Sequence, residues 1–256
     1  MGAGMSHKRS DRIAAELRRR ILDGELGPGT RLESEATLSH RLVTSKWTLR
    51  EALKSLETQG LIRVRSGPGG GASVTEVSAD TASDLLWNFC FSRDLSVSDI
   101  YALRKLLEPA LARQVTPLLD EAALDALADR AHRCCSYRSE GRGVSEREDE
   151  LNFHVLLAGA CPNPLLRFLV EFLNGLLLKV VAAQNVDPAL AGVDLNYHGR
   201  DYHLELIDAF RARDGVRAER LMFEHMEAAQ HYMEEVATQA ARRRAAPQSE
   251  DHRQEP

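Results

Sequence analysis

The chain has 256 residues, of which 43% are hydrophobic and 28% are charged, and its net charge at pH 7 is −5. This length suits two domains of ordinary size, each with its own core. No apolar run reaches the roughly 18 uninterrupted residues of a membrane span, and the N-terminus lacks the apolar stretch of a signal peptide. We therefore expect a cytoplasmic protein with no membrane partner.

Charge is unevenly distributed along the chain. Residues 1–75 hold 13 Lys and Arg against 8 Asp and Glu, a net charge of +5, and the remaining residues carry a net charge of −10. A basic first third on an acidic body favours a polyanionic partner for the N-terminal part.

The N-terminal part has the pattern of three helices followed by a β-hairpin. Apolar residues recur at helical spacing, Ser34 and Ser45 are suited to cap the second and third helices, and a glycine-rich loop separates two short strands. Such a unit is a winged helix, and its second and third helices form a helix-turn-helix. The predicted elements are helices over about 10–22, 35–42 and 46–59 and strands over 61–65 and 72–76.

Helical periodicity resumes after a short predicted linker at 77–82 and continues without a convincing strand. The fold class is therefore mainly α, with a winged helix-turn-helix domain over 8–76 and an all-α bundle of about six or seven helices over 83–241. A polar tail over 242–256 is expected to be disordered. The predicted helices of the bundle cover about 84–92, 97–115, 120–137, 145–159, 163–185, 194–213 and 215–240.

The third helix carries cations and hydrogen-bond donors at its start. Lys46 and Arg50 are four residues apart and share one face; Arg50 suits bidentate pairing with guanine, and Lys46 suits guanine or a phosphate. A merely solvated basic face is the alternative, but the helix-turn-helix context favours DNA. The wing adds a basic strand and a glycine-rich loop whose backbone can come close to a phosphate or the minor groove. The predicted contacts to double-stranded operator DNA are Ser45, Lys46, Trp47, Thr48, Arg50, Arg65, Gly69 and Gly70.

Histidines and a carboxylate form a second candidate site. Glu150 and His154 are four residues apart on one helical face, and His203 and His225 lie on the last two predicted helices. Three imidazoles and a carboxylate inside a bundle can ligate a divalent transition metal such as Zn, Ni, Co or Mn. Histidines that only fill core positions or face solvent are the alternative.

Two strings in the N-terminal part carry a family resemblance. They are Ile21-x-Asp23-Gly24-x-Leu26-x-Pro28-Gly29-x-x-Leu32-x-Ser34-Glu35 and Leu49-Arg50-Glu51-Ala52-Leu53-x-x-Leu56-x-x-x-Gly60-Leu61-Ile62. With them, residues 10–75 resemble the winged helix of the GntR family of bacterial regulators. The resemblance implies operator contacts from Arg50 and from the segment 45–48, where Trp47 is bulkier than the usual small residue.

Three further strings extend the resemblance to residues 80–240. They are Leu103-Arg104-x-x-Leu107-Glu108-Pro109, Phe153-His154-x-x-Leu157 and His203-x-x-x-Ile207-x-Ala209-Phe210. They resemble the FCD domain, the effector domain of the FadR-like subfamily of these regulators.

The FCD resemblance implies a ligand set. Many FCD domains bind a metal through an Asp-x-x-x-His pair and two later histidines, positions that fall here on Glu150, His154, His203 and His225, with Glu where Asp is usual. The resemblance also implies a small carboxylate effector, for which Arg104 is the candidate cation. Further predicted effector contacts are Asn174 and Asn196.

Together these features predict a ligand-responsive transcription regulator that acts as a repressor and is not an enzyme. A homodimer follows from operator geometry, because two recognition helices read half-sites about one helical turn apart. One alternative is the same regulator with a metal-free pocket for an acyl-CoA-like ligand. A more remote one is a metal-dependent enzyme, since histidines with a carboxylate also form catalytic sites, although an enzyme has no need of a winged helix.

Overall fold

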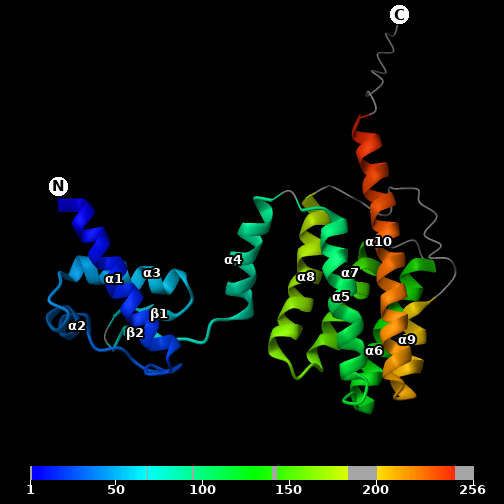
Figure 1. Cartoon of the computed structure of the whole chain (residues 1–256), viewed down its shortest axis with the longest axis horizontal. Helices are drawn as coiled ribbons and strands as arrows, with labels where there is room; N and C mark the ends of the chain where they lie inside the picture. Colours follow the sequence, from blue (N-terminus) through cyan, green and yellow to red (C-terminus); the bar gives the residue numbers. More distant parts are fainter. Residues whose placement is uncertain (1, 68, 94, 140–142, 184–200, 246–256) are drawn as a thin grey trace, which may run out of the picture. The chain divides into compact units, whose positions relative to one another are not determined.

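The computed structural model describes residues 2–67, 69–93, 95–139, 143–183 and 201–245. The chain separates into two compact units, Met1–Phe89 and Cys90–Pro256 (Figure 1). The described residues form ten helices and one two-stranded antiparallel sheet, so the predicted mainly α class is confirmed. None of these helices is long and apolar enough to cross a membrane.

The first unit contains the predicted three helices and hairpin. Helix α1 begins earlier than predicted, and the serines predicted as caps accept hydrogen bonds from the backbone N–H groups of Thr37 and Thr48, both at 3.1 Å. In the hairpin, Ile62 pairs with Val74. The bounds of these elements are α1 Gly2–Leu22, α2 Glu35–Arg41, α3 Lys46–Thr58, β1 Ile62–Arg65 and β2 Gly71–Val74.

An apolar stripe on α3 holds this unit together. Leu49, Ala52 and Leu56 recur at helical spacing and are fully buried, packed in one cluster with Leu17 of α1 and Ile62 of β1. Burial of this stripe leaves the opposite face of α3 to the solvent.

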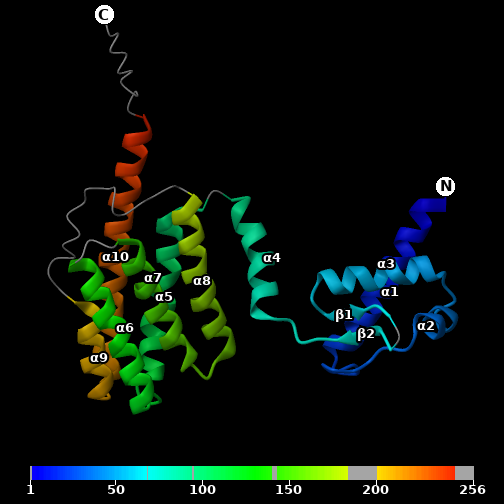
Figure 2. The same ribbon diagram turned by 180° about the vertical axis from the view of Figure 1, so that it is seen from behind.

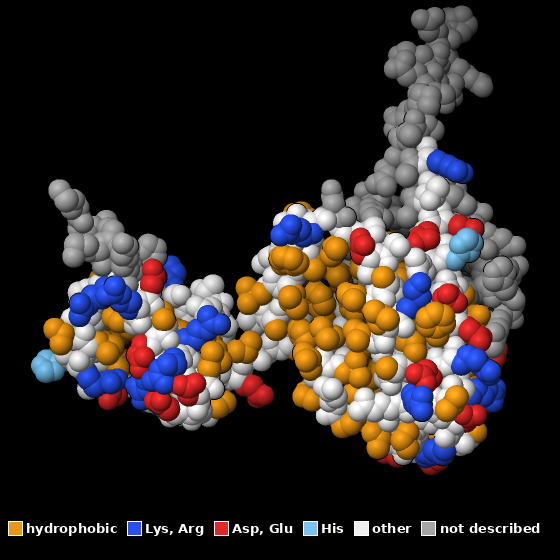
Figure 3. Space-filling model, in the orientation of Figure 1, with side chains coloured by type: hydrophobic (Ala, Val, Ile, Leu, Met, Phe, Trp, Pro, Cys, Tyr) orange, Lys and Arg blue, Asp and Glu red, His pale blue; other side chains and the backbone are white. Residues whose placement is uncertain are grey.

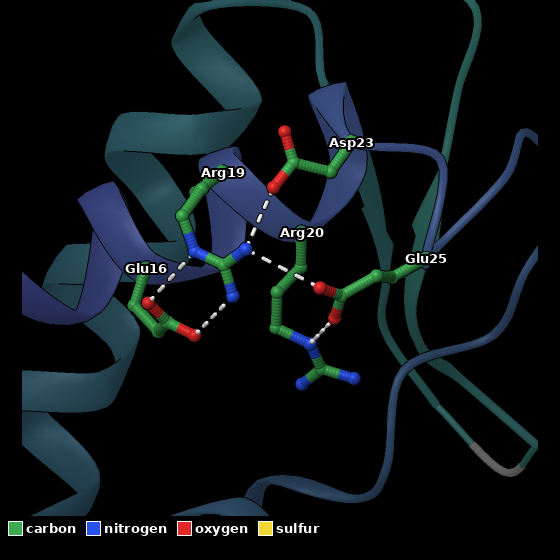
Figure 4. Close-up of polar contacts among 5 residues, drawn as sticks. All are labelled: Glu16, Arg19, Arg20, Asp23 and Glu25. Carbon is green, nitrogen blue, oxygen red and sulfur yellow. Dashed lines mark hydrogen bonds and ion pairs between the residues drawn. The ribbon is translucent and has the colours of Figure 1, made fainter.

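A surface network ties the end of α1 to the turn that follows it (Figure 4). The Arg19 guanidinium donates hydrogen bonds to Glu16 and Asp23 and reaches Glu25 at 3.3 Å, while Arg20 Nε donates to Glu25 at 3.0 Å. The hydrogen bond and charge of Arg19 hold the pKa of the Glu16 carboxyl below its ordinary value. The network orients the turn that leads to α2.

The predicted linker at 77–82 needs a correction, because helix α4, Ala79–Phe91, begins inside it. The Ser78 hydroxyl accepts a hydrogen bond from the backbone N–H of Thr81 at 3.1 Å, which starts the helix. Thr81 in turn packs on Gly60, where an added Cβ would lie 3.0 Å from the threonine methyl group. The start of α4 therefore belongs to the first unit.

The second unit is a bundle in which α5 contacts α7, α8 and α10 (Figure 2). Helix α10 continues into the segment predicted as a tail, and residues 246–256 lie outside the described part, as do residues 184–200 at the start of the predicted penultimate helix. The bounds are α5 Val97–Val115, α6 Glu121–Ser139, α7 Gly143–Gly159, α8 Pro164–Ala183, α9 Tyr202–Arg211 and α10 Gly215–Ala245.

Candidate functional site

Three of the four predicted metal ligands meet inside the bundle. His154 of α7, His203 of α9 and His225 of α10 are buried, and one ring nitrogen of each lies within 4.8 Å of the others. The Nε2 atoms of His154 and His225 are 3.2 Å apart. The three rings come from separate helices, so the fold rather than local spacing brings them together.

The histidine group fits a divalent metal. Tetrahedral zinc with Zn–N bonds of roughly 2.0–2.1 Å places its ligand nitrogens about 3.3 Å apart, close to the 3.2 Å between His154 and His225. Neutral imidazoles supply the lone pairs that Zn, Ni and Mn accept. Three protein nitrogens leave coordination positions for oxygen ligands.

The two adjacent carboxylates on α7, Asp149 and Glu150, have different surroundings. Glu150 is buried, but its carboxylate is not within the group of atoms that the three histidines form. The neighbouring Asp149 forms ion pairs with Arg130 and Arg133 of α6. Asp149 thus stabilises the packing of α6 on α7. Glu150 lies one helical turn from His154, and its charge contributes to raising the pKa of Arg104.

A buried ion pair lies beside the histidines. Arg104 Nε donates to Glu108 Oε1 at 2.6 Å, and Glu108 Oε2 lies 2.5 Å from His154 Nδ1; all three side chains are fully buried. Burial raises the pKa of the Glu108 carboxyl, but its interactions with Arg104 and His154 outweigh burial and lower that pKa to about 2. Burial lowers the pKa of the Arg104 guanidinium. Negative charge nearby, chiefly that of Glu108 and also that of Glu150, outweighs burial and raises this pKa above its ordinary value.

Two predicted effector-binding residues, Arg104 and Asn174, are found at this ion pair: Arg104 belongs to it and Asn174 lies beside it. The Nη1 and Nη2 atoms of Arg104 are buried without a hydrogen-bond partner among the described residues, and so is Oδ1 of Asn174. Asn174 Nδ2 donates to the Val170 carbonyl at 2.8 Å and reaches Glu108 Oε1 at 3.4 Å. The third predicted contact, Asn196, lies outside the described residues.

Sequence reasoning gave no role in the site to Glu108, which entered only as part of the string that resembles the FCD domain. A signal was available, because the Arg104–Glu108 pair lies on the stripe of α5 that includes Ile100 and Leu111, both fully buried. Two opposite charges one turn apart on an apolar stripe indicate a buried pair. The contact with His154 had no signal, because it joins two helices far apart in the chain.

The predicted DNA contacts on α3 differ in their exposure to solvent. Lys46 and Arg50 are exposed, Trp47 is 61% exposed, and Arg50 Nε donates to Glu35 at 2.8 Å. Thr48 is buried, and its hydroxyl lies 2.8 Å from that of the capping Ser45. Thr48 therefore lies inside the unit, and Lys46, Trp47 and Arg50 are the side chains that α3 exposes near its start.

The wing is held by Arg31, which precedes α2 and forms an isolated β-bridge with Ser73. Arg31 donates to the carbonyl groups of Gly69 and Gly70, and Arg65 at the end of β1 is exposed. An added Cβ at Gly70 would clash with the Arg65 carbonyl and lie 2.8 Å from that of Gly67. The wing therefore exposes a backbone that admits no side chain at Gly70.

Comparisons with known proteins cover both units. The pattern of the bacterial regulatory proteins of the gntR family matches residues 9–71, and that of the FCD domain matches residues 99–228. The HTH-type transcriptional regulator LutR of Bacillus subtilis (strain 168) is 28% identical over 206 residues, which cover 80% of this chain and 92% of LutR. The HTH-type transcriptional repressor NanR of Edwardsiella tarda (strain FL6-60) is 29% identical over 227 residues, which cover 86% of this chain and 83% of NanR.

A solved structure has the same fold. The structure of Streptococcus agalactiae GntR superposes with a TM-score of 0.60 at 24% sequence identity and covers 87% of this chain and 99% of its own. The winged helix, the helical bundle that follows it in the chain and the matching patterns agree with the resemblances found in the sequence. The chain therefore belongs to the gntR family of bacterial regulatory proteins, with an FCD domain as its second unit, and is a transcription regulator.

Proposed function

We propose that this regulator represses transcription as a homodimer on operator DNA, and that a small carboxylate controls it through a divalent metal held by His154, His203 and His225. The observation that carries the proposal is the buried group of three imidazoles next to Arg104, whose terminal nitrogens have no hydrogen-bond partner in the described part of the chain. Buried donors of this kind are costly unless a ligand uses them.

The metal, which we take to be Zn, Ni or Mn, would act as a Lewis acid that accepts an oxygen of the effector. Glu150 is our proposed fourth ligand, since it is buried one turn from His154. Arg104 would donate two charge-assisted hydrogen bonds to the same carboxylate. Asn174 Oδ1 would accept from a hydroxyl or amide of the effector, and Asn196 stays a predicted contact.

DNA binding would use the first turn of α3 and the wing. The exposed Lys46, Trp47 and Arg50 would face the major groove, where cations read guanine and apolar surface contacts the thymine methyl group. Ser45, Arg65 and the wing glycines Gly69 and Gly70 would approach phosphates or the minor groove. NanR, to which the chain is similar, is a transcriptional repressor, and this likeness supports repression.

A dimer is supported by an apolar surface on the second unit. Figure 3 shows hydrophobic side chains gathered over α5 and α8. The exposed leucines of these two helices are Leu103, Leu106, Leu165 and Leu178. Covering this surface with a second copy would provide two recognition helices for a two-fold operator. Effector and DNA would then be linked reciprocally, since each ligand favours one state of the dimer.

Elemental analysis of protein purified without a His-tag tests the proposal. We expect near-stoichiometric transition metal in the wild type and its loss in the His203→Ala/His225→Ala variant. His231→Ala is the matched control, because His231 is 70% exposed and pairs with Glu235. A wild type that contains no metal, even after incubation with Zn²⁺, Ni²⁺ and Mn²⁺, would refute the metal site while leaving DNA binding by the first unit to be measured separately.

A further inference from the structure

A single carboxylate connects the two halves of the site. The oxygens of Glu108 have different partners: Oε1 accepts from Arg104 Nε at 2.6 Å and has Asn174 Nδ2 at 3.4 Å, whereas Oε2 lies 2.5 Å from His154 Nδ1. These contacts bring α5, α7 and α8 together at one fully buried group. Glu108 is therefore engaged on both sides before any ligand arrives.

The contact at Nδ1 determines which nitrogen of the His154 ring is available to a metal. The Nδ1–Oε2 contact is an ion-pair distance without hydrogen-bond geometry. A carboxylate so close to Nδ1 favours a proton on that nitrogen and leaves the Nε2 lone pair for a metal. The Nε2 atom is the one that lies 3.2 Å from Nε2 of His225. A carboxylate on the second nitrogen also makes the imidazole a more basic ligand.

The contact at Oε1 determines which nitrogens of Arg104 remain for an anion. Glu108 engages Nε, and the described residues offer no hydrogen-bond partner to Nη1 or Nη2. The guanidinium is held at one edge while its terminal nitrogens are left for an anion. The same carboxylate thus orients a metal ligand and an anion donor.

We propose that Glu108 is a positioning residue that fixes His154 for metal binding and Arg104 for the effector, so that the two depend on each other. This proposal rests on the metal site proposed above. The competing explanation gives Glu108 a structural role only, as the counter-charge that allows Arg104 to be buried. The two explanations differ in what happens to the metal when the fold is intact.

The test compares full-length wild type with Glu108→Gln, which keeps the shape of the side chain but removes the charge. Zn²⁺ affinity is measured by competition with a chromogenic chelator, and the Co²⁺ absorption spectrum reports the ligand geometry. We expect Zn²⁺ affinity to fall about 10- to 100-fold, as for other partners of metal-bound histidines, and the Co²⁺ bands to shift. Glu121→Gln, at an exposed position in the first turn of α6, should bind as the wild type does.

Thermal unfolding of the metal-free variants establishes that they fold. If Glu108→Gln is unfolded, Glu108→Asp provides the same measurements, because it retains the charge beside Arg104 while shortening the reach to His154. A folded variant at Glu108 with wild-type Zn²⁺ affinity and Co²⁺ spectrum overturns the proposal. A wild type that binds neither ion overturns the metal site as well, so the wild-type measurement separates the two failures.

Discussion

Arg104 is the largest of the fully buried side chains in the described part of the chain. Burying a guanidinium is expensive, and a counter-charge in contact repays the cost only when the remaining donors are also satisfied. Glu108 supplies the counter-charge, and Nη1 and Nη2 are left over. An apolar pair of similar volume would stabilise the bundle at least as well, so the pair is better explained by a ligand than by stability.

Replacing Arg104 with Met should lower the free energy of unfolding by about 3–5 kcal/mol, because Glu108 is left buried without its main counter-charge. The Arg104→Met/Glu108→Gln double variant should recover part of the loss. Urea unfolding followed by circular dichroism measures both. Arg113→Met on the same helix is the control, since Arg113 is 59% exposed and its pair with Glu219 is solvated. Equal losses at Arg104 and Arg113 would contradict the argument.

The same pair makes stability depend on pH in a defined direction. Contacts with Arg104 and His154 lower the pKa of the Glu108 carboxyl from 4.5 to about 2. A carboxyl whose pKa is lower in the folded state contributes stability that is complete above its unfolded pKa and is lost as the pH falls toward its folded pKa. The stability difference between wild type and Glu108→Gln should therefore be smaller at pH 4 than at pH 5.5. A difference that grows on acidification would contradict the low pKa of Glu108.

At the scale of helices and strands, most of the fold could be predicted because each element carries its own signal. The buried stripe of α3 and the caps Ser34 and Ser45 are local patterns, and the structure contains both. Features that depend on contacts between elements could not be predicted. The burial of Thr48 follows from how α3 packs, and the contact of Glu108 with His154 requires α5 to lie beside α7.

The wing provides the prediction at this scale. Gly70→Ala should force the loop to rearrange, because the new methyl group would clash with the Arg65 carbonyl. We expect weaker operator binding in a fluorescence anisotropy titration, with an operator selected from random DNA by the wild type. Gly27→Ala is the matched control, since an added Cβ there meets nothing within 4 Å. Operator binding that Gly70→Ala leaves unchanged would remove the wing from the proposed interface.

For the whole molecule, the division of labour follows the charge of the chain. The basic first third forms the winged helix, and the acidic remainder forms the bundle with the histidines. A ligand buried in the bundle can alter DNA binding only if it favours one state of the whole regulator over another. A dimer provides such states, because a two-fold operator constrains both winged helices at once.

The dimer prediction concerns the apolar surface on α5 and α8. Leu106 of α5 is 71% exposed, so Leu106→Glu should place a charge in the proposed interface and leave a monomer. Size-exclusion chromatography with light scattering measures the mass. The monomer should also bind a two-half-site operator at least about tenfold more weakly, since one copy reads only one half-site. Val216→Glu on α10 is the control at a comparable exposure of 65%, and it should remain dimeric. If Leu106→Glu stays dimeric while binding DNA normally, the copies associate through another surface.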